Sequence, residues 1–353
     1  MTDIDWLFEQ VAQPDEAARA AAIERQNQLT KPPGSLGRLE MLATDFAAWQ
    51  GVAIPKLERV GLAVFAADHG IAAQGVSAFP QSVTAQMVAN FAAGGAAVAV
   101  LAREAGAEMT VVNLGTVAPT DDVPGVINRH LGPGTADFTE APAMDRATLA
   151  AALAAGAEQV DPELSLFIGG EMGIANTTSA AAVFAGITGL GGATTVGRGT
   201  GVDDAGLARK RAVVDAGLAR HSARLQGVER PAAALAALEC LGGLEIAALA
   251  GAFVAAAQRG VPVLVDGFIS SVAAAVAVYL NTGVSEWLLF GHRSAEAGHA
   301  RVLDLLDGVP LLDLDMRLGE GSGAMAAVPV IRAGLAVHAK MATFADAGVS
   351  HSA

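Results

Sequence analysis

The stretch Leu164–Glu171, LSLFIGGE, decides the fold because it joins a short apolar run to a glycine turn that carries a carboxylate. An apolar run bounded by turn signals is typical of a strand that is buried on both faces. Asn176-Thr177-Thr178 follows and can cap the helix that we predict over Ser179–Ala185. A strand, a polar turn and a helix in this order form the repeating unit of a parallel α/β sheet.

The same unit recurs along most of the chain. We therefore predict a doubly wound, mostly parallel α/β sheet. The predicted strands are Val60–Ala66, Met109–Val112, Leu164–Ile168, Val263–Val265, Trp287–Phe290 and Val309–Leu314. The predicted helices between them are Gln86–Ala105, Ala147–Ala155, Ser179–Ala185, Ala205–Ala219, Ala232–Ala257, Ser270–Tyr279 and Ala295–Leu306.

Both ends of the chain differ from this pattern, because their helices lack strand partners. Helices are predicted over Asp15–Leu29, Leu36–Gln50 and Ala324–Ala345. Pro-Pro-Gly after Lys31 ends the first of them, and Ser35 can cap the second. We expect residues 1–50 and 324–353 to pack together as a smaller helical subdomain. Residues 51–323 would then form a large Rossmann-like domain that holds the active site.

Composition limits the classes of function. The chain has 353 residues, 52% of them hydrophobic, and a formal net charge of -14. Such an acidic protein is not a general binder of nucleic acid or anionic membranes, so any phosphate must be held by local donors. Cys240 is the single cysteine, which excludes disulfide scaffolds and cysteine zinc sites. The first residues carry no apolar signal core, and Gly243–Ala257 is too short to span a bilayer. A soluble, cytoplasmic protein is predicted.

Polar side chains stand at or just after the ends of the predicted strands. In open α/β sheets, ligands bind in the crevice beyond the carboxyl ends of the strands. We therefore expect these side chains to share one rim and to mark a binding site. They are Asp68, Asn113, Glu171, Asp266, Ser294 and Glu320.

Glu320 is the strongest catalytic candidate on this rim. It stands among three glycines in Met316–Gly323, MRLGEGSG, just after an apolar run. Glycines allow a sharp turn and a close approach of ligands. A carboxylate held there would lose water and become a better base. Glu171 in the same crevice would give a carboxylate pair, of which one member could hold a raised pKa.

A phosphate site and a metal site have weaker signals. Gly197–Gly201 is a loop rich in backbone donors, and with Arg198 and Arg209–Arg211 it could cradle a phosphate. It is not a dinucleotide-binding G-x-G-x-x-G motif. The histidines at 69, 292 and 299 match no metal-ligand spacing. The acidic pair Asp121-Asp122 follows no apolar strand and is interpreted as a surface turn, so no metal site is predicted.

Several longer motifs occur together and carry a specific resemblance. They are Lys31–Glu40 (KPPGSLGRLE), Ala67–Gly70, Pro80–Leu101, Gly170–Thr178 (GEMGIANTT), Val265–Phe268, Ser294–Glu296 and Met316–Ala324 (MRLGEGSGA). Because these motifs occur together and in this order, the chain closely resembles the nicotinate-nucleotide–dimethylbenzimidazole phosphoribosyltransferase family. The resemblance spans nearly the whole chain from Lys31 onward.

The resemblance implies a reaction, an assembly and a base. Members of the family move phosphoribose from nicotinate mononucleotide to 5,6-dimethylbenzimidazole, releasing nicotinate and α-ribazole 5′-phosphate, a precursor of the lower ligand of cobalamin. They are homodimers with a doubly wound domain and a small helical domain from both termini, and they need no cofactor. The family's catalytic glutamate corresponds to Glu320, which would take the proton from one benzimidazole nitrogen as the other attacks C1 of the ribose. Whether Glu171 shares that proton stays open.

The resemblance also implies two binding regions. The phosphate and ribose region corresponds to Gly173, Gly199, Thr200, Gly201, Lys210 and Ser294. The benzimidazole pocket corresponds to Phe79, Pro80, Gln86 and Met87, and the choice between the last two stays open.

Two other classes of function remain to be separated from this one. A nucleotide-dependent oxidoreductase would need a strand-linked G-x-G-x-x-G and a later ribose-binding acid, an arrangement that the sequence lacks. A non-catalytic module that binds a nucleobase or riboside would share the pocket but would show binding without turnover.

Overall fold

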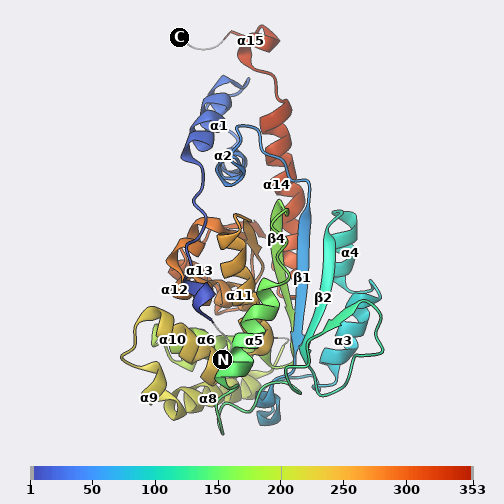
Figure 1. Cartoon of the computed structure of the whole chain (residues 1–353), viewed down its shortest axis with the longest axis vertical. Coiled ribbons are helices and arrows are strands. Elements are labelled where there is room, and N and C mark those ends of the chain that lie inside the picture. The colour runs from blue at the N-terminus through green and yellow to red at the C-terminus, as the bar shows by residue number, and fades with distance from the viewer. Residues whose placement is uncertain (1–3, 200, 351–353) are drawn as a thin grey trace.

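The chain forms one sheet of seven parallel strands in the order β3-β2-β1-β4-β5-β6-β7, in a computed structural model that describes residues 4–199 and 201–350. The sequence runs outward from the centre in both directions, which confirms the predicted doubly wound α/β fold (Figure 1). The strands are β1 (Val60–Ala67), β2 (Glu108–Gly115), β3 (Val126–Asn128), β4 (Leu166–Met172), β5 (Val263–Val265), β6 (Leu288–Arg293) and β7 (Pro310–Asp313).

The central strand β1 shows why an apolar run becomes a strand here. All eight of its residues are buried, as expected for a parallel strand that is covered on both faces. Ala63 and Phe65 pack into one hydrophobic core, whereas Leu62 and Val64 pack into the other. The alternation of a strand's side chains therefore supplies both layers of the core.

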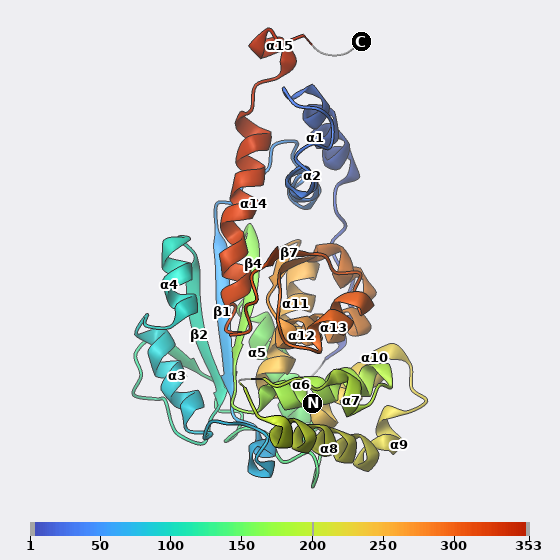
Figure 2. The same cartoon turned by 180° about the vertical axis from the view of Figure 1, so that it is seen from behind.

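One layer of helices covers the first core. It holds α5 (Arg146–Ala157), α6 (Asn176–Thr188), α7 (Gly192–Thr195), α8 (Asp204–Arg220), α9 (Ser222–Leu225), α10 (Arg230–Leu241), α11 (Leu244–Gln258), α12 (Phe268–Leu280) and α13 (His299–Leu305). The other face carries α3 (Val83–Ala92), α4 (Ala97–Glu104) and the first half of α14 (Ser322–Lys340), as Figure 2 shows from behind. Short 3-10 turns occur at η1 (Asp5–Phe8), η2 (Gly70–Gln74) and η3 (Thr282–Trp287).

Two predicted helices are in fact pairs of helices, and one strand was missed. The prediction over Gln86–Ala105 breaks at Gly94-Gly95, between α3 and α4, and that over Ala232–Ala257 breaks at Gly242-Gly243, between α10 and α11. Consecutive glycines lower helix propensity, which explains both breaks. The missed strand, β3, has only three residues, so it shows almost no periodicity. The last predicted helix also ends early, at Lys340, before the short α15 (Phe344–Ala347).

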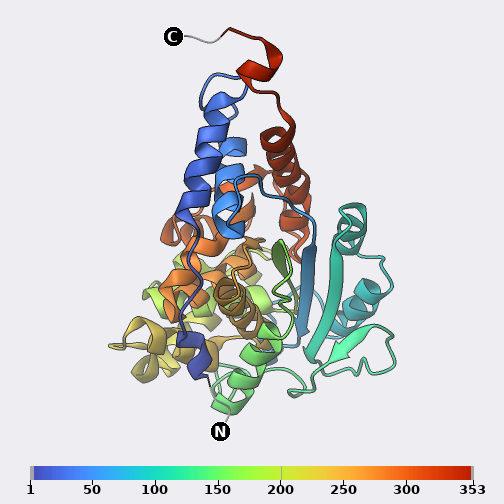
Figure 3. The ribbon, with the colours of Figure 1, turned by 45° about the horizontal axis from the view of Figure 1, so that its top comes forward.

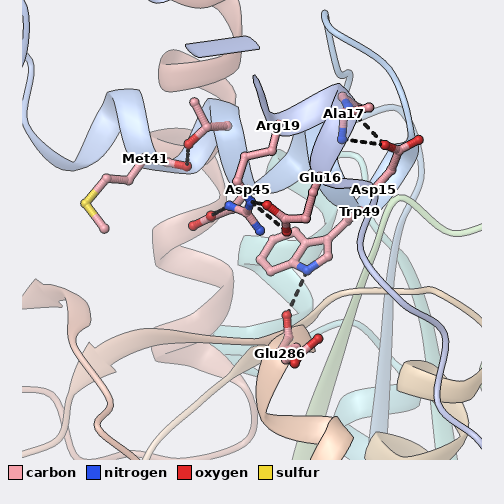
Figure 4. A network of polar contacts seen from close by, with 10 residues as sticks. Asp15, Glu16, Ala17, Arg19, Met41, Asp45, Trp49 and Glu286 are labelled. Carbon is pink, nitrogen blue, oxygen red and sulfur yellow. Dashed lines mark hydrogen bonds and ion pairs between the residues drawn. The ribbon is translucent and has the colours of Figure 1, made fainter. Parts of the chain in front are cut away.

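Helices from both chain ends lie side by side at one end of the molecule. They are α1 (Glu16–Gln28), α2 (Arg38–Gln50) and the second half of α14 (Figure 3). Arg19 of α1 pairs with Asp45 of α2, and Trp49 Nε1 donates to the Glu286 carbonyl oxygen over 2.9 Å (Figure 4). The start of α2 differs from the prediction, because Ser35 makes no cap and Gly37 is the N-cap residue. The domain boundaries at residues 50 and 324 stay a prediction.

Two apolar segments are long enough to cross a bilayer by length and composition, Val83–Glu104 and Ser322–Lys340. Core helices pass the same test. The first is interrupted between α3 and α4, and the second packs Val328 and Ile331 into the core beside the sheet. Both segments are accounted for by the fold.

Candidate active site

A crevice opens beyond the carboxyl ends of β4, β5 and β6. It encloses about 840 Å³ of free space with its open mouth included, within the size range of small-molecule sites. Its walls come from the β4–α6 connection, the glycine loop before α8, the segment after β6 and the turn before α14. Ligand sites in open α/β sheets occur at this edge.

Glu320 lines the crevice from a strained turn. Its φ is +67°, between Gly319 at +83° and Gly321 at +91°. A non-glycine residue rarely adopts such a conformation, so neighbouring structure must hold it. Gly170 helps, because a side chain there would overlap the Glu320 carbonyl oxygen. The turn therefore presses directly on β4.

The Glu320 carboxylate is buried and incompletely satisfied. The side chain is 6% exposed, and its Oε2 has no hydrogen-bond partner among the described residues. Burial raises the pKa of Glu320 to about 7; the Val98 N–H works against this rise, and the negative charge of Asp266 adds to it. A carboxyl with this pKa can accept and release a proton near neutral pH.

Asp266 holds the Glu320 turn from below. One of its oxygens accepts from the Gly321 N–H at 3.2 Å and the other from the Ala324 N–H at 2.8 Å. These are among the free amides at the start of α14, where a carboxylate is favoured. His292 Nε2 lies 3.6 Å from the same carboxylate. The role of Asp266 is thus to fix the turn, and it does not line the crevice.

Glu171 differs from its prediction in position, since it lies within β4 and not in the turn after it. Burial raises its pKa well above the ordinary value, and the charges of Glu245 and Asp266 add to the rise. Asn176 Nδ2 donates to its Oε2. Asn176 therefore does not cap α6, whose N-cap is Ala175 at φ +78° without a side-chain cap. The hydrogen bond to Glu171 replaces the predicted cap.

The residues predicted to bind phosphate and ribose are mostly brought together. Gly173, Gly199, Lys210 and Ser294 all line the crevice. Lys210 is buried, and its Nζ donates to Thr177 Oγ1 over 2.9 Å. Burial lowers the pKa of Lys210 to about 8, against the opposing charge of Glu296. Gly201 stands outside the described lining, and Thr200 lies outside the described residues.

Sequence reasoning missed two participants in this region, Thr177 and Glu296. Thr177 is predicted as a cap, but its hydroxyl instead meets Lys210. Both oxygens of Glu296 accept from the Gly199 N–H, each at 3.1 Å. The SAE motif was the only sequence signal for Glu296, and it gave no role.

The predicted base-binding residues do not line the crevice among the residues described. Phe79, Pro80 and Gln86 are exposed and Met87 is half-buried. They belong to α3 and the turn before it. This segment is tied to the site by a hydrogen bond in which Thr84 Oγ1 accepts from the Ile174 N–H at 3.1 Å. The predicted base region therefore adjoins the crevice without entering it.

The predicted rim is only half correct. Glu171, Ser294 and Glu320 line the crevice, with Asp266 just beneath. Asp68 instead accepts from the Val117 N–H, and Asn113 lines a separate small cavity with Thr116 and Thr120. Asp68 follows β1 and Asn113 lies within β2, and both strands are on the other side of the switch point between β1 and β4, which explains the separation.

The histidines are held in hydrogen bonds. Buried His69 lies between Ser179 Oγ at 2.9 Å and Glu245 Oε1 at 2.8 Å. His299 bridges Ser271 Oγ and the Ser294 N–H. Among the residues that the structure describes, no group of three or more His, Cys, Asp or Glu side chains is arranged to hold a metal ion.

Comparison with known proteins gives a consistent result. A family model described as a phosphoribosyltransferase matches residues 11–349. The chain is 55% identical to the nicotinate-nucleotide–dimethylbenzimidazole phosphoribosyltransferase of Xanthomonas axonopodis pv. citri, over 98% of this chain and 99% of that one. It is 54% identical to the same enzyme of Azotobacter vinelandii, over 98% of each. The crystal structure of that enzyme from Thermus thermophilus matches with a TM-score of 0.88 at 42% identity, over 96% of this chain and 100% of that one.

Proposed function

The chain belongs to the nicotinate-nucleotide–dimethylbenzimidazole phosphoribosyltransferase family, and on this premise we propose its reaction and the roles of its crevice residues. The enzyme transfers phosphoribose from nicotinate mononucleotide to 5,6-dimethylbenzimidazole. The products are nicotinate and α-ribazole 5′-phosphate, for the lower ligand of cobalamin. One observation carries the assignment of the base: the buried Glu320 carboxylate in its glycine turn, with a free Oε2 and a pKa of about 7.

The proton balance of the reaction needs one acceptor. One benzimidazole nitrogen forms a bond to C1 of the ribose while the C1–nitrogen bond to nicotinate breaks. The bonding electron pair returns to the pyridinium ring, so the leaving group loses its positive charge. The other benzimidazole nitrogen then gives up its proton, and Glu320 Oε2 accepts it. The crevice also accelerates the reaction by holding the two substrates in the orientation that the attack requires.

Glu171 has a different role in this proposal. Its raised pKa keeps it protonated to higher pH than an ordinary glutamate, because it is buried near two other carboxylates. A protonated carboxyl is a hydrogen-bond donor, not a base. Glu171 accepts from the backbone N–H of Glu320 and so holds the Glu320 turn, and its own carboxyl proton is available to the ribose. Glu320 takes the proton alone.

The phosphate of nicotinate mononucleotide binds at the other end of the crevice. Lys210, the Gly199 N–H, Ser294 and the glycine at 173 are the proposed contacts, and the resemblance adds Thr200 and Gly201. Lys210 Nζ would lie 3.0 Å from a side-chain carbon placed on Gly199, so these two residues are close neighbours in the crevice. They offset the net charge of -14 locally.

The benzimidazole binds between Glu320 and the segment that holds Phe79, Pro80, Gln86 and Met87. Support comes from the contact of Thr84 with Ile174, which fixes this segment beside the crevice. Ring faces and a thioether suit a flat aromatic ligand. The choice between Gln86 and Met87 as the nearer contact stays open.

The assembly and location are part of the same proposal. The enzyme is a cytoplasmic homodimer whose residues 51–323 form a Rossmann-like domain and whose termini form the helical one. Val309, Leu314 and Leu318 are more than half exposed beside the edge strand β7, a surface that a second copy would cover. Sedimentation of the purified protein at the mass of a monomer would contradict the dimer.

A two-substrate assay tests the reaction. The enzyme is mixed with nicotinate mononucleotide, with 5,6-dimethylbenzimidazole, or with both, and nicotinate is followed by chromatography. Release only with both substrates is the expected result. Binding of both without release would instead indicate a non-catalytic module, and tight binding of NAD would favour an oxidoreductase.

A further inference from the structure

The carboxylate of Glu296 lines the crevice and is held there by one backbone amide of the glycine loop. The side chain is 8% exposed, and both of its oxygens accept from the Gly199 N–H at 3.1 Å. A side chain on Gly197 would overlap Glu296 Oε1, so the loop wraps closely around the carboxylate. Glycine loops with inward amides are shaped to hold oxyanions. Here the oxyanion comes from the protein.

Two side chains near the Glu296 carboxylate, Ser294 and Lys210, can also donate hydrogen bonds to an anion. Ser294 Oγ accepts from the Glu296 N–H at 3.2 Å, so its own hydroxyl proton is available to another acceptor. Lys210 Nζ lies beside Gly199 and donates to Thr177 Oγ1. The charge of Glu296 nevertheless favours the protonated lysine. Glu296 thus takes the loop amide and partly balances the lysine.

We propose that Glu296 is an internal competitor of the substrate's phosphate: it holds the glycine loop while the site is empty, and the phosphate must displace it from the Gly199 N–H. This inference rests on the proposed phosphate site and assigns to it a residue that tunes its affinity. The need to displace the Glu296 carboxylate also lowers the affinity of the site for anions of lower charge. A phosphate dianion can replace it at the amide and the lysine, whereas a monovalent carboxylate gains nothing by the exchange.

The competition gives Glu296 an effect of unexpected sign. Replacing a residue that touches ligand-binding groups ordinarily weakens binding. Here the variants Glu296→Gln and Glu296→Ala remove a charged acceptor, and hydrogen bonds to charged acceptors are roughly twice as strong as neutral ones. Both variants should bind inorganic phosphate about tenfold more tightly than the natural protein, a difference of about 1.4 kcal/mol. The alanine variant shows that no new contact from the glutamine amide is responsible.

Calorimetric titration of the full-length protein with inorganic phosphate measures this effect. Asp304→Asn is the matched control, because Asp304 is exposed on α13 and its loss changes the net charge equally without touching the crevice. The control should bind phosphate as the natural protein does. The KM for dimethylbenzimidazole, which carries no phosphate, should stay unchanged in both Glu296 variants. Weaker phosphate binding in both Glu296 variants would show that Glu296 supports the loop, and would overturn the proposal.

A second variant separates this inference from the assignment of the site. Lys210→Met should weaken phosphate binding at least about tenfold if the phosphate binds where we place it. Unchanged binding in that variant would overturn the phosphate site itself, and the competition with it. A crystal structure with bound phosphate gives a direct view: the Gly199 N–H should donate to the phosphate, with Glu296 turned away. If both hydrogen bonds from the Gly199 N–H to Glu296 were intact beside a bound phosphate, the displacement of Glu296 would be refuted, while the phosphate site would stand.

Discussion

Two glycine turns in this molecule carry a glutamate at the start of a long helix, and they use it in opposite ways. The turn before α2 holds Gly34 at φ +77° and Gly37 at +54°, with Glu40 in the first helical turn. The turn before α14 holds Glu320 between two glycines that also have positive φ. In sequence the two stretches look alike: small residues, a leucine and one carboxylate.

Their carboxylates have different partners. Glu40 Oε1 lies 2.8 Å from Lys31 Nζ and accepts from the Leu36 N–H, and the Gly34 N–H donates to its other oxygen. Burial alone would raise the pKa of Glu40, but Lys31 and the two amides bring it below the ordinary value. Glu320 has a free oxygen and a raised pKa. The local turn positions a carboxylate, and its tertiary partners decide whether it stabilises the fold or exchanges protons.

The largest contrast should follow from replacing each carboxylate by its amide. Glu320→Gln should lower kcat by about two to four powers of ten, since it removes a general base. Its thermal unfolding midpoint should stay close to that of the natural protein or rise. Nicotinate release under saturating substrates measures the first quantity. Turnover within a factor of about three of the natural enzyme would remove Glu320 as the base.

Glu40→Gln should show the reverse. Loss of the charge leaves Lys31 buried without its counter-ion, which should cost about 1–3 kcal/mol of unfolding free energy. Urea unfolding measures this loss. The kcat of the folded variant should be unchanged, because Glu40 is not among the residues that line the crevice. A loss of turnover without a loss of stability would erase the distinction between the two turns.

A matched pair of glycine substitutions probes the turns themselves. Gly37→Ala and Gly319→Ala each force an alanine into a backbone conformation with positive φ, at about 1–3 kcal/mol of stability. Gly37 has open space around it, whereas a side chain on Gly319 would overlap Glu171 Oε1. Only Gly319→Ala should therefore also lower kcat, by at least about tenfold. Equal kcat values in the two variants would show that the Glu320 turn tolerates displacement.

The smallest effect concerns the pH dependence of stability. The folded-state pKa of Glu320 is raised from 4.5 to about 7, so the folded state holds this proton more tightly and loses stability as pH rises through that range. The pKa of Glu40 is lowered, so its contribution is present above its ordinary value and is lost as pH falls. Urea unfolding at several pH values should give Glu320→Gln a smaller loss of stability between pH 4.5 and about 7 than the natural protein. Parallel curves would contradict the raised pKa.

Much of the fold could be predicted from sequence, because buried parallel strands are continuous apolar runs. That signal found every strand except β3, whose residues Val126–Asn128 are too few for any pattern. Two helix predictions continued across Gly94-Gly95 and Gly242-Gly243, because the alanine-rich sequence on both sides of each pair favours a helix. The paired glycines lower helix propensity enough to end α3 and α10, and the prediction gave this local signal too little weight.

The site was less predictable. The strand-end pattern placed Glu320 and Glu171 on one rim and the resemblance added Lys210, and all three side chains line the crevice. The roles of Asn176, Asp266 and Glu296 were missed or misassigned because each depends on a contact that local propensity does not contain. Glu296 and Gly199 are 97 positions apart, and Asp266 and Gly321 are 55 apart. Local propensity predicts caps and turns, but it does not report which remote carboxylate meets them.

Helix α14 connects the two ends of this molecule mechanically. Its 19 residues, about 28 Å long at about 1.5 Å per residue, begin beside Glu320 and end among the terminal helices. There Arg25 donates to the carbonyl oxygens of His338 at 2.8 Å and Ala339 at 2.9 Å. Pro329 lies inside this helix and lacks the N–H that would otherwise donate to the carbonyl oxygen four residues earlier. The turn that holds Glu320 and the packing of the terminal helices are therefore the two ends of one continuous helix, so a change at the chain ends and a change at that turn act on the same element.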